Sequence, residues 1–391
     1  MRTGWHAPFL VACSLLAPWA QAQDSDAAKP PATSTGKAGS GSVVYQLGFY
    51  DHADSGDGNP FLDESLTVIE AVTILDYNVT DRFGYGIKLS YDYVSSASID
   101  RLSKFPDQSG ASADNYVGLD FSMRYQTSDT WLVGGHLGAS VEYDYNSLGL
   151  GLNAINKPRN TNTTLTYSLD AYLDDVDIIR FDGVQDGSES RTTFSGTVNW
   201  HQILTPTLQG EIGLTLATQS GFLSTPYNAV VVENPGDPPN PNLDNMARGT
   251  EIAEVLPDSR TRTALYGRLR YSNTPGRAWE MGSRLYNDDW GITGISLEPR
   301  LYQTLVKDKL EMRLRYRFYT QSESDYFQDS FTTTEEFRTQ DSDLADLSSH
   351  TLGVLFDWES TIGPLSFGLD FTSRSDGLDF LFASFGYTYR F

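Results

Sequence analysis

Long stretches of this sequence alternate between apolar and polar residues, which is the period of a β-strand and not of a helix. The clearest example has Phe83, Tyr85, Ile87, Leu89, Tyr91 and Tyr93 interleaved with Gly84, Gly86, Lys88, Ser90 and Asp92. The stretches 117–125 and 310–319 follow the same rule. These runs are long enough to cross a tilted bilayer, which needs roughly 9–11 residues per strand.

The polar half of each stretch separates a membrane barrel from a soluble sandwich. Charged residues such as Lys88 and Arg315 stand in mid-strand, where a dry sandwich core would reject them. A water-filled lumen accepts them. Aromatic residues gather at the ends of the stretches, as in the interfacial girdles of outer-membrane barrels. The pattern therefore predicts an all-β chain that forms a single closed antiparallel transmembrane β-barrel.

Composition excludes other classes of protein. The 391 residues carry 28 Lys and Arg against 51 Asp and Glu, a net charge of -23, so we expect no nucleic-acid partner. Aromatic residues make up 13% of the chain, which argues against disorder. No long apolar run follows residue 23, which argues against a helical membrane protein.

The N-terminal segment is expected to be a secretory signal. Arg2 precedes an apolar stretch, and Ala20-Gln21-Ala22 has the small-x-small pattern of a cleavage site. We expect a signal peptide at 1–22, a flexible periplasmic linker at 23–41 and the barrel at 42–391. A lipoprotein reading, with Cys13 as the lipidated residue, is the alternative. Cleavage after residue 22 would remove the one cysteine and exclude disulfides.

The last stretch has an apolar face that ends at Phe391. Leu381, Ala383, Phe385, Tyr387, Tyr389 and Phe391 occupy that face. It resembles the C-terminal signal that the outer-membrane barrel assembly machinery reads. We therefore expect Tyr387, Tyr389 and Phe391 to form an assembly signal.

Connection lengths indicate how many strands there are. In such barrels the periplasmic turns are short and the extracellular loops are longer. The short turns are expected at 78–82, 127–130, 157–162, 202–207, 274–277, 305–309 and 361–364. The long connections are expected at 51–64, 96–112, 175–190, 219–260 and 323–347.

Fourteen strands would put two of the long connections on the periplasmic side. Sixteen strands remove this conflict if tight turns interrupt the chain at Asp144-Tyr145-Asn146 and Asn287-Asp288-Asp289, which are rich in turn-forming residues. The apolar face also changes parity after Tyr143. We therefore predict sixteen strands, with fourteen as the alternative.

Five motifs resemble those of a family of Gram-negative outer-membrane barrels catalogued as a domain of unknown function. They lie between residues 96 and 330 and are Ser109-Gly110-Ala111-Ser112, Glu142-Tyr143-Asp144-Tyr145, Ser220-Gly221-Phe222-Leu223-Ser224-Thr225-Pro226-Tyr227, Arg284-Leu285-Tyr286-Asn287-Asp288-Asp289-Trp290-Gly291-Ile292 and Arg315-Tyr316-Arg317-Phe318-Tyr319-Thr320-Gln321-Ser322. The resemblance implies an outer-membrane barrel and carries no assigned activity.

Arginines are the most informative charged residues. They alternate with leucines that we expect to face lipid, so they are predicted to form a basic strip on the lumen wall. The strip comprises Arg268, Arg270, Arg284, Arg300, Arg313, Arg315 and Arg317. Carboxylates that also point into the lumen are predicted to form an acidic wall on the opposite side. That wall comprises Asp120, Glu142, Asp170, Glu211, Asp357 and Asp370.

Two roles fit these charges, and they are compatible. Opposed basic and acidic walls would select solutes by charge at a constriction. Alternatively, Glu280, Glu298 and Glu311 could neutralise the arginines locally and brace the wall.

Other chemistry has little support. His136 and Ser140 share a face but stand about 13 Å apart along a strand, too far for a nucleophile and its base. We expect no enzyme activity, no cofactor and no metal site, although a loose calcium site in the acidic loops 51–64 and 174–189 is an alternative. The 219–260 connection is long for a passive turn and could form a constriction, a docking surface or a mobile loop.

The leading hypothesis is a porin-like outer-membrane conduit for small polar or charged solutes. The runner-up is a non-conducting scaffold that anchors or sheathes a periplasmic or surface protein. Expected partners are outer-membrane lipid and lipopolysaccharide, the barrel assembly machinery and, for the scaffold, that periplasmic or surface protein.

Overall fold

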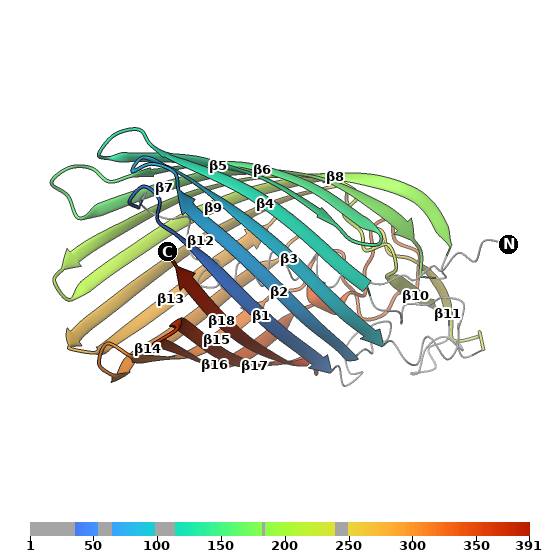
Figure 1. Ribbon diagram of the computed structural model, residues 1–391. Helices are drawn as coiled ribbons and strands as arrows, with labels where there is room; N and C mark the ends of the chain where they lie inside the picture. The colour runs from blue at the N-terminus through green and yellow to red at the C-terminus, as the bar shows by residue number, and fades with distance from the viewer. Residues whose placement is uncertain (1–35, 54–64, 98–113, 182–183, 239–248) are drawn as a thin grey trace.

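Sixteen antiparallel strands close into one barrel in the computed structural model (Figure 1). The structure describes residues 36–53, 65–97, 114–181, 184–238 and 249–391. The barrel strands are β1 (Gly41–Ala53), β2 (Ser65–Asn78), β3 (Phe83–Ala97), β4 (Asp114–Gln126), β5 (Trp131–Val141), β6 (Tyr145–Asn156), β7 (Thr163–Ile179), β8 (Gln185–Thr205), β9 (Leu208–Gly221), β12 (Ser259–Thr274), β13 (Arg277–Asp288), β14 (Thr293–Val306), β15 (Leu310–Gln321), β16 (Leu347–Ser360), β17 (Gly363–Arg374) and β18 (Asp379–Arg390). The predicted count of sixteen is confirmed.

Each strand pairs with its sequence neighbour, except that β9 pairs directly with β12. The intervening β10 (Ala229–Glu233) and β11 (Gly249–Ala253) form a separate two-stranded sheet. The barrel closes where β1 pairs with β18. At this seam the Gly41 and Phe391 backbones exchange two hydrogen bonds, with N···O distances of 2.8 and 3.0 Å. Closure leaves no open strand edge, which a bilayer requires.

The connections divide between the two ends as the length argument predicts. Short turns such as 127–130, 206–207 and 275–276 lie at the end where β18 finishes (Figure 1). The opposite end carries 222–258 and 322–346. The two predicted tight turns are present there as well, at 142–144 and 289–292, two or three residues from their expected positions.

One expected long connection is mostly strand. Segment 175–190 contains the end of β7 and the start of β8, and residues 180–184 alone connect them. Val176 and Ile178 are 3% and 1% exposed, whereas Asp175 and Asp177, which alternate with them, point outward. The alternation therefore continues, but acidic residues stand where lipid-facing positions would be apolar. The sequence pattern did not predict strands here because β7 and β8 extend beyond the apolar, lipid-facing part of the barrel. Their outward residues are therefore acidic.

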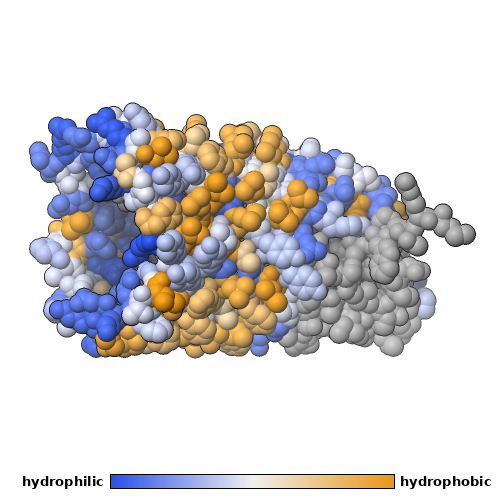
Figure 2. Space-filling view, viewed as in Figure 1, coloured by the Kyte–Doolittle hydropathy of each residue, from blue (hydrophilic) through white to orange (hydrophobic). Residues whose placement is uncertain are grey.

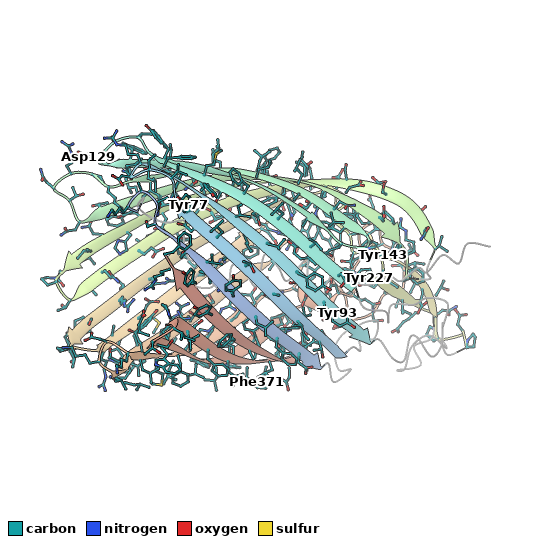
Figure 3. All side chains as sticks on the ribbon, viewed as in Figure 1. Tyr77, Tyr93, Asp129, Tyr143, Tyr227 and Phe371 are labelled. Carbon is teal, nitrogen blue, oxygen red and sulfur yellow. The ribbon has the colours of Figure 1, made fainter. Side chains whose placement is uncertain are left out.

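The outer surface carries an apolar belt. On the face shown in Figure 2, large apolar residues cover the middle of the barrel and hydrophilic residues lie toward its ends. Exposed large apolar residues are found on strands all around the barrel. Leu119, Leu152, Leu169 and Leu352 on the outer surface are 52–64% exposed, a pattern that suits lipid contact. Aromatic side chains mark two levels, with Tyr77 toward the short-turn end and Tyr93, Tyr143 and Phe371 toward the other (Figure 3). Within the described residues, no helix is long and apolar enough to cross a membrane.

The N-terminal expectations fall mainly outside the described residues. The signal peptide, Cys13 and most of the linker lie there. Residues 36–40 are fastened to the β2–β3 turn. The Gly36 amide donates to Asn78 Oδ1 at 3.0 Å, and the Ala38 amide donates to Asp81 Oδ1 at 2.8 Å.

Candidate functional site

Four adjacent strands, β12 to β15, place the predicted basic strip on one wall of the lumen. Leu269, Leu285 and Leu314 on these strands are 40–54% exposed on the outer face. Because side chains alternate along a strand, all seven arginines of the strip point to the inner face. The seven are Arg268, Arg270, Arg284, Arg300, Arg313, Arg315 and Arg317. A charge on the lipid face would cost about 2–4 kcal/mol at the midplane.

Part of the strip is neutralised locally. Arg300 is 4% exposed and is paired with Glu298 on its own strand, and its Nη1 lies 3.5 Å from Glu280 Oε1. Arg268 reaches the same Glu280 oxygen at 3.4 Å. Two glutamates thus brace two arginines across β12, β13 and β14. This arrangement corresponds to the bracing role.

Arg315 forms a third ion pair. Its Nη2 lies 2.9 Å from Asp370 Oδ1, although β16 separates their strands. Gly353 stands between them in register, and a Cβ at that position would lie 1.8 Å from Asp370 Oδ1. The absent side chain lets the pair cross the strand. Asp370 therefore lies beside the basic strip and not across the lumen from it.

Two more of the six predicted acidic residues also flank the strip. Glu211 on β9 is in register with Arg268 on β12 and accepts a hydrogen bond from Asn199 Nδ2. Asp357 on β16 is in register with Glu311 on β15. The prediction that these residues face the strip across the lumen is wrong for Glu211, Asp357 and Asp370. The cause is strand order, because β9, β16 and β17 border β12–β15 or lie one strand farther.

The remaining acidic residues lie on more distant strands. Asp120 is on β4, and Asp170 is on β7 with its Oδ1 3.8 Å from His136 Nε2. Glu142 lies in the β5–β6 turn, where its amide donates to the Tyr145 carbonyl at 2.7 Å. His136 thus has a carboxylate neighbour and not a serine nucleophile.

Sequence reasoning missed two carboxylates on the far wall. Glu70 on β2 and Asp92 on β3 are in register, and Lys88 on β3 is in register with Asp120 on β4. Lys88 and Asp92 alternate with the outward-facing Leu89 and Tyr91. The strand alternation that placed the arginines in the lumen could therefore have placed Lys88 and Asp92 there too. The wall opposite the strip is therefore acidic, but through Glu70, Asp92 and Asp120.

The other arginines of the strip contact aromatic rings or face small neighbours. The Arg270 guanidinium lies 3.9 Å from the Tyr302 ring centroid, and that of Arg317 lies 5.3 Å from the Tyr319 centroid. Arg313 is in register with Tyr302 on one side and Leu355 on the other. Arg284 is in register with Tyr266 and Ser296. Guanidinium groups over ring faces stay charged and oriented.

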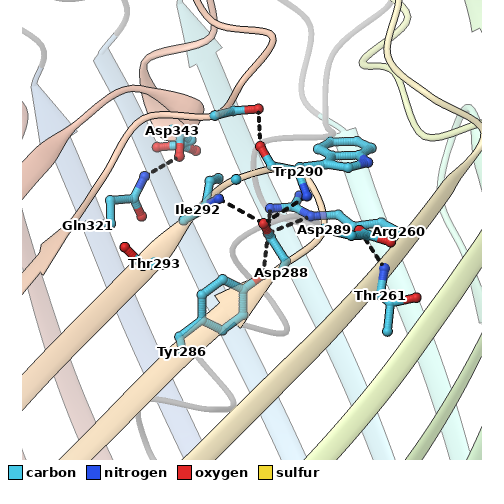
Figure 4. Close-up of polar contacts among 12 residues, drawn as sticks. Arg260, Thr261, Tyr286, Asp288, Asp289, Trp290, Ile292, Thr293, Gln321 and Asp343 are labelled. Carbon is cyan, nitrogen blue, oxygen red and sulfur yellow. Dashed lines mark hydrogen bonds and ion pairs between the residues drawn. The ribbon is translucent and has the colours of Figure 1, made fainter.

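The β13–β14 turn explains the most distinctive sequence motif. Asp288 Oδ2 accepts hydrogen bonds from Arg260 Nε at 2.9 Å and Tyr286 Oη at 2.8 Å (Figure 4). Asp288 Oδ1 accepts from the backbone amides of Trp290 and Ile292 at 3.1 and 2.9 Å. Gly291 has φ of 89°, a conformation that glycine adopts without strain. Arg260, at 6% exposure, is a buried partner that sequence reasoning assigned to a loop.

The two long loops pack together into a single structure at the outer end of the barrel. We call residues 222–238, 249–258 and 322–346 the cap. Val255 and Arg338 exchange backbone hydrogen bonds of 3.2 and 2.7 Å, which join the two loops. Phe331 and Val230 are 1% and 0% exposed within the cap. The described parts of the 219–260 connection, 219–238 and 249–260, therefore pack with residues 322–346, and neither of these parts is a simple exposed turn.

A buried carboxylate joins the loops within the cap. Glu254, 2% exposed, accepts hydrogen bonds from the Thr225 amide at 2.7 Å and from Thr339 Oγ1 at 2.6 Å. Asn228 Nδ2 donates to Asp341 Oδ2 at 3.1 Å and to Glu254 Oε2 at 3.4 Å. One amide group therefore bridges two buried carboxyl groups from different loops.

Burial makes both carboxyl groups unusually basic. Loss of hydration, together with the nearby charges of Asp343 and Glu254, raises the pKa of Asp341 to about 8. Burial also raises the pKa of Glu254, against the hydrogen bonds from Thr339, Thr225 and Asn228. Protonation of this pair removes like-charge repulsion within the cap.

The cap is fastened to the basic side of the barrel. Asp343 Oδ1 pairs with Arg374 Nη1 of β17 at 2.5 Å, and Gln321 Nε2 donates to the Asp343 carbonyl at 2.9 Å. Leu256 and Leu344 of the cap pack with Trp290 and Ile292 of the β13–β14 turn. The cap therefore stands over the strands that carry the basic strip.

The predicted assembly residues lie on the outer face next to the seam. Tyr389 and Phe391 are 52% and 49% exposed, with ring centroids 6.0 Å apart. Tyr387 stacks on Tyr45 of β1 at 6.4 Å. Their role in assembly stays a prediction.

The acidic loops give no metal cluster in the described part of the chain. Residues 54–64 lie outside it, and most of 174–189 is β-strand. Across the described residues, no three histidine, cysteine or carboxylate side chains are placed to hold a metal ion.

Comparison with solved structures shows barrels with little sequence identity. The ferric enterobactin receptor PfeA of Pseudomonas aeruginosa matches at 10% identity and a TM-score of 0.44, covering 87% of this chain and 54% of the receptor. The siderophore receptor PirA of Acinetobacter baumannii matches at 9% and 0.46, covering 86% and 53%. OpdK of Pseudomonas aeruginosa, solved with vanillate, matches at 10% and 0.42, covering 91% and 100%. The chain thus spans about half the length of the two receptors.

The family resemblance suggested by the motifs is confirmed by the sequence comparison. No curated protein matches the chain. The family described as "Protein of unknown function (DUF3570)" matches residues 103–371, and the chain belongs to that family.

Proposed function

We propose that this protein is an outer-membrane conduit through which small polar or charged solutes diffuse past the basic strip. The observation that carries the proposal is the charge distribution inside the barrel. Guanidinium groups line β12–β15, and Glu70, Asp92 and Asp120 face them from β2–β4. A sixteen-strand barrel has room for an aqueous channel unless something fills it. Opposed charges then create a transverse field that sorts solutes by charge.

The outer surface supports a membrane location. The apolar belt and the two levels of aromatic residues suit a bilayer with lipid and lipopolysaccharide around the barrel (Figures 2 and 3). The barrel assembly machinery would then insert the chain by recognising the aromatic face of β18.

A non-conducting scaffold is the second candidate, and specific observations favour it. Arg268, Arg300 and Arg315 are each paired with a carboxylate, and the cap covers the outer end above them. Braced charges and a packed cap would also serve a barrel that anchors a periplasmic or surface protein.

A flux experiment separates the two candidates. The purified protein is reconstituted into liposomes, and swelling is recorded with small neutral, anionic and cationic solutes. A conduit predicts swelling well above that of liposomes holding heat-denatured protein, with rates that depend on solute charge. Swelling no faster than this control, for every solute, would contradict the conduit and favour the scaffold.

A further inference from the structure

We propose that Arg284 and Arg317 form a binding site for a small organic carboxylate on the lumen wall, a proposal that rests on the conduit function above. Arg284 is the eighth residue of β13 and Arg317 the eighth of β15. Both strands run from the short-turn end to the cap end, so both arginines lie in the outer half of the barrel. Solutes that enter beside the cap would meet them early.

These two arginines differ from Arg268, Arg300 and Arg315 in having no carboxylate partner among the described residues. Arg268, Arg300 and Arg315 each have a carboxylate oxygen within 4 Å, whereas within the described ranges Arg284 and Arg317 have none. Ser296 on β14 is in register with Arg284 and with Tyr319, which is two residues along β15 from Arg317, so the two like charges lie diagonally across a single strand. Glu298 acts on Arg317 electrostatically but is paired with Arg300. An incoming anion would relieve this repulsion.

Small residues stand beside Arg284 on the lumen wall. Ser296 on β14 stands in register between Arg284 on β13 and Tyr319 on β15. Gly282 is the next inward-facing position below Arg284, and Gly294 is in register with Tyr286. The wall between the arginines is therefore lined by Ser296 and by Glu298, which is in register with Gly282 and is paired with Arg300. Gly294 is covered by Tyr319, since a Cβ at that glycine would lie 3.1 Å from Tyr319 Oη.

Three tyrosine rings frame this part of the wall. Tyr266 is in register with Arg284, Tyr286 is the next inward-facing residue on β13, and Tyr319 is in register with Ser296. Each phenol group already has a hydrogen-bond partner. Tyr266 Oη accepts from Asn199 at 2.7 Å, Tyr286 donates to Asp288 at 2.8 Å and Tyr319 donates to Gln321 at 2.6 Å. The rings are thereby held in place and offer apolar surface more than free hydroxyl groups.

This combination identifies the class of ligand. Guanidinium groups form paired, charge-assisted hydrogen bonds with the two oxygens of a carboxylate. Ring faces and edges favour a flat apolar body next to that head group. The structure thus fits a small carboxylate with a planar body better than a bare inorganic anion.

Calorimetric titration of the full-length protein in detergent tests the site. The probe is benzoate at constant chloride concentration, compared with inorganic phosphate. Benzoate should bind more tightly than phosphate, and Arg284→Gln and Arg317→Gln should each weaken it by about tenfold or more, as expected for the loss of a charge-assisted hydrogen bond. The control is Arg159→Gln, an arginine of the 157–162 turn whose side chain is 73% exposed, which should bind benzoate as wild type does.

Folding is verified by heat-modifiable gel mobility. Because there are two independent variants, the test still works if one of them does not fold. Unchanged benzoate binding in both folded variants would overturn the site, as would phosphate binding as tight as that of benzoate. The experiment needs no ion flux. If the arginine variants lose benzoate binding but the wild-type protein does not conduct, the site is supported and the conduit is rejected. If the wild-type protein conducts but the variants bind benzoate as it does, the conduit is supported and the site is rejected.

Discussion

Arg315 and Asp370 meet directly above Gly353, with Arg315 Nη2 2.9 Å from Asp370 Oδ1. The pair links β15 to β17 across the intervening β16. Their side chains are 13% and 20% exposed, so the charges are shielded from solvent and depend on each other. Removing either partner would take away the counter-charge that this ion pair supplies in the wall.

The first prediction concerns the glycine that permits this contact. Gly353→Ala places a Cβ 1.8 Å from Asp370 Oδ1, which must displace the pair. We expect the free energy of unfolding to fall by about 1–3 kcal/mol, the usual cost of overpacking. Gly282→Ala is the matched control, because its nearest contact is an ordinary 3.6 Å. Urea unfolding of both variants in detergent measures the difference, and equal stabilities would contradict the bridging role of the pair.

The second prediction separates two roles of the C-terminal residue. Deleting Phe391 removes both the aromatic ring and two backbone hydrogen bonds to Gly41, whereas Phe391→Ala removes the ring alone. If the assembly machinery reads the aromatic face, both changes should reduce the heat-modifiable form in outer-membrane fractions. Normal assembly of Phe391→Ala together with failure of the deletion would assign the effect to closure of the seam.

The third prediction concerns topology. Asp237 lies in the cap and Gly276 in the turn between β12 and β13, at opposite ends of the barrel. An epitope inserted beside Asp237 should therefore be labelled by antibody on intact cells, and one beside Gly276 should be labelled only after permeabilisation. Surface labelling at Gly276 would reverse the assigned orientation.

The fourth prediction concerns the pH dependence of the cap. The pKa of Asp341 is raised from 3.8 to about 8, so the folded cap binds a proton more tightly than the unfolded chain does. The stability that this proton contributes is full below pH 4 and is lost as the pH rises through about 8. Hydrogen-exchange protection of the cap amides, corrected for intrinsic rates, should fall between pH 5 and pH 9.

Asp341→Asn provides the control for this effect. The amide cannot ionise, so cap protection in this variant should change much less with pH. Amides of the barrel strands serve as an internal reference within each sample. A cap whose protection follows that of the barrel at every pH, in both proteins, would be inconsistent with a proton held by the buried pair.

Strand parity explains why the basic strip could be predicted from sequence. Arg313, Arg315 and Arg317 alternate with Leu314 and Tyr316, and alternation determines the face whatever the shape of the barrel. The position of Asp370 beside Arg315 could not be predicted from this alternation. Its contact with Arg315 depends on strand order and on a glycine in a third strand, and neither follows from the local pattern around either residue.

The cap lay beyond sequence reasoning for a different reason. Glu254 and Asp341 are 87 positions apart in loops without periodicity, and their shared partner Asn228 carries no distinctive motif. In the same way, the end of β7 resembled a loop because its outward residues are acidic. Pattern analysis is reliable where lipid imposes apolar residues, and it weakens beyond the apolar belt.

The central claim is that solutes pass along the basic strip, and the reversal potential across a planar bilayer in a potassium chloride gradient tests it most directly. Arg284 is a better residue to change than Arg315, which is held by Asp370. We predict that the wild-type protein conducts and that Arg284→Glu shifts the reversal potential toward cation selectivity, whereas Arg159→Glu in the exposed turn leaves it unchanged. Absence of conductance in the wild-type protein, or identical reversal potentials for wild type and Arg284→Glu, would contradict the account.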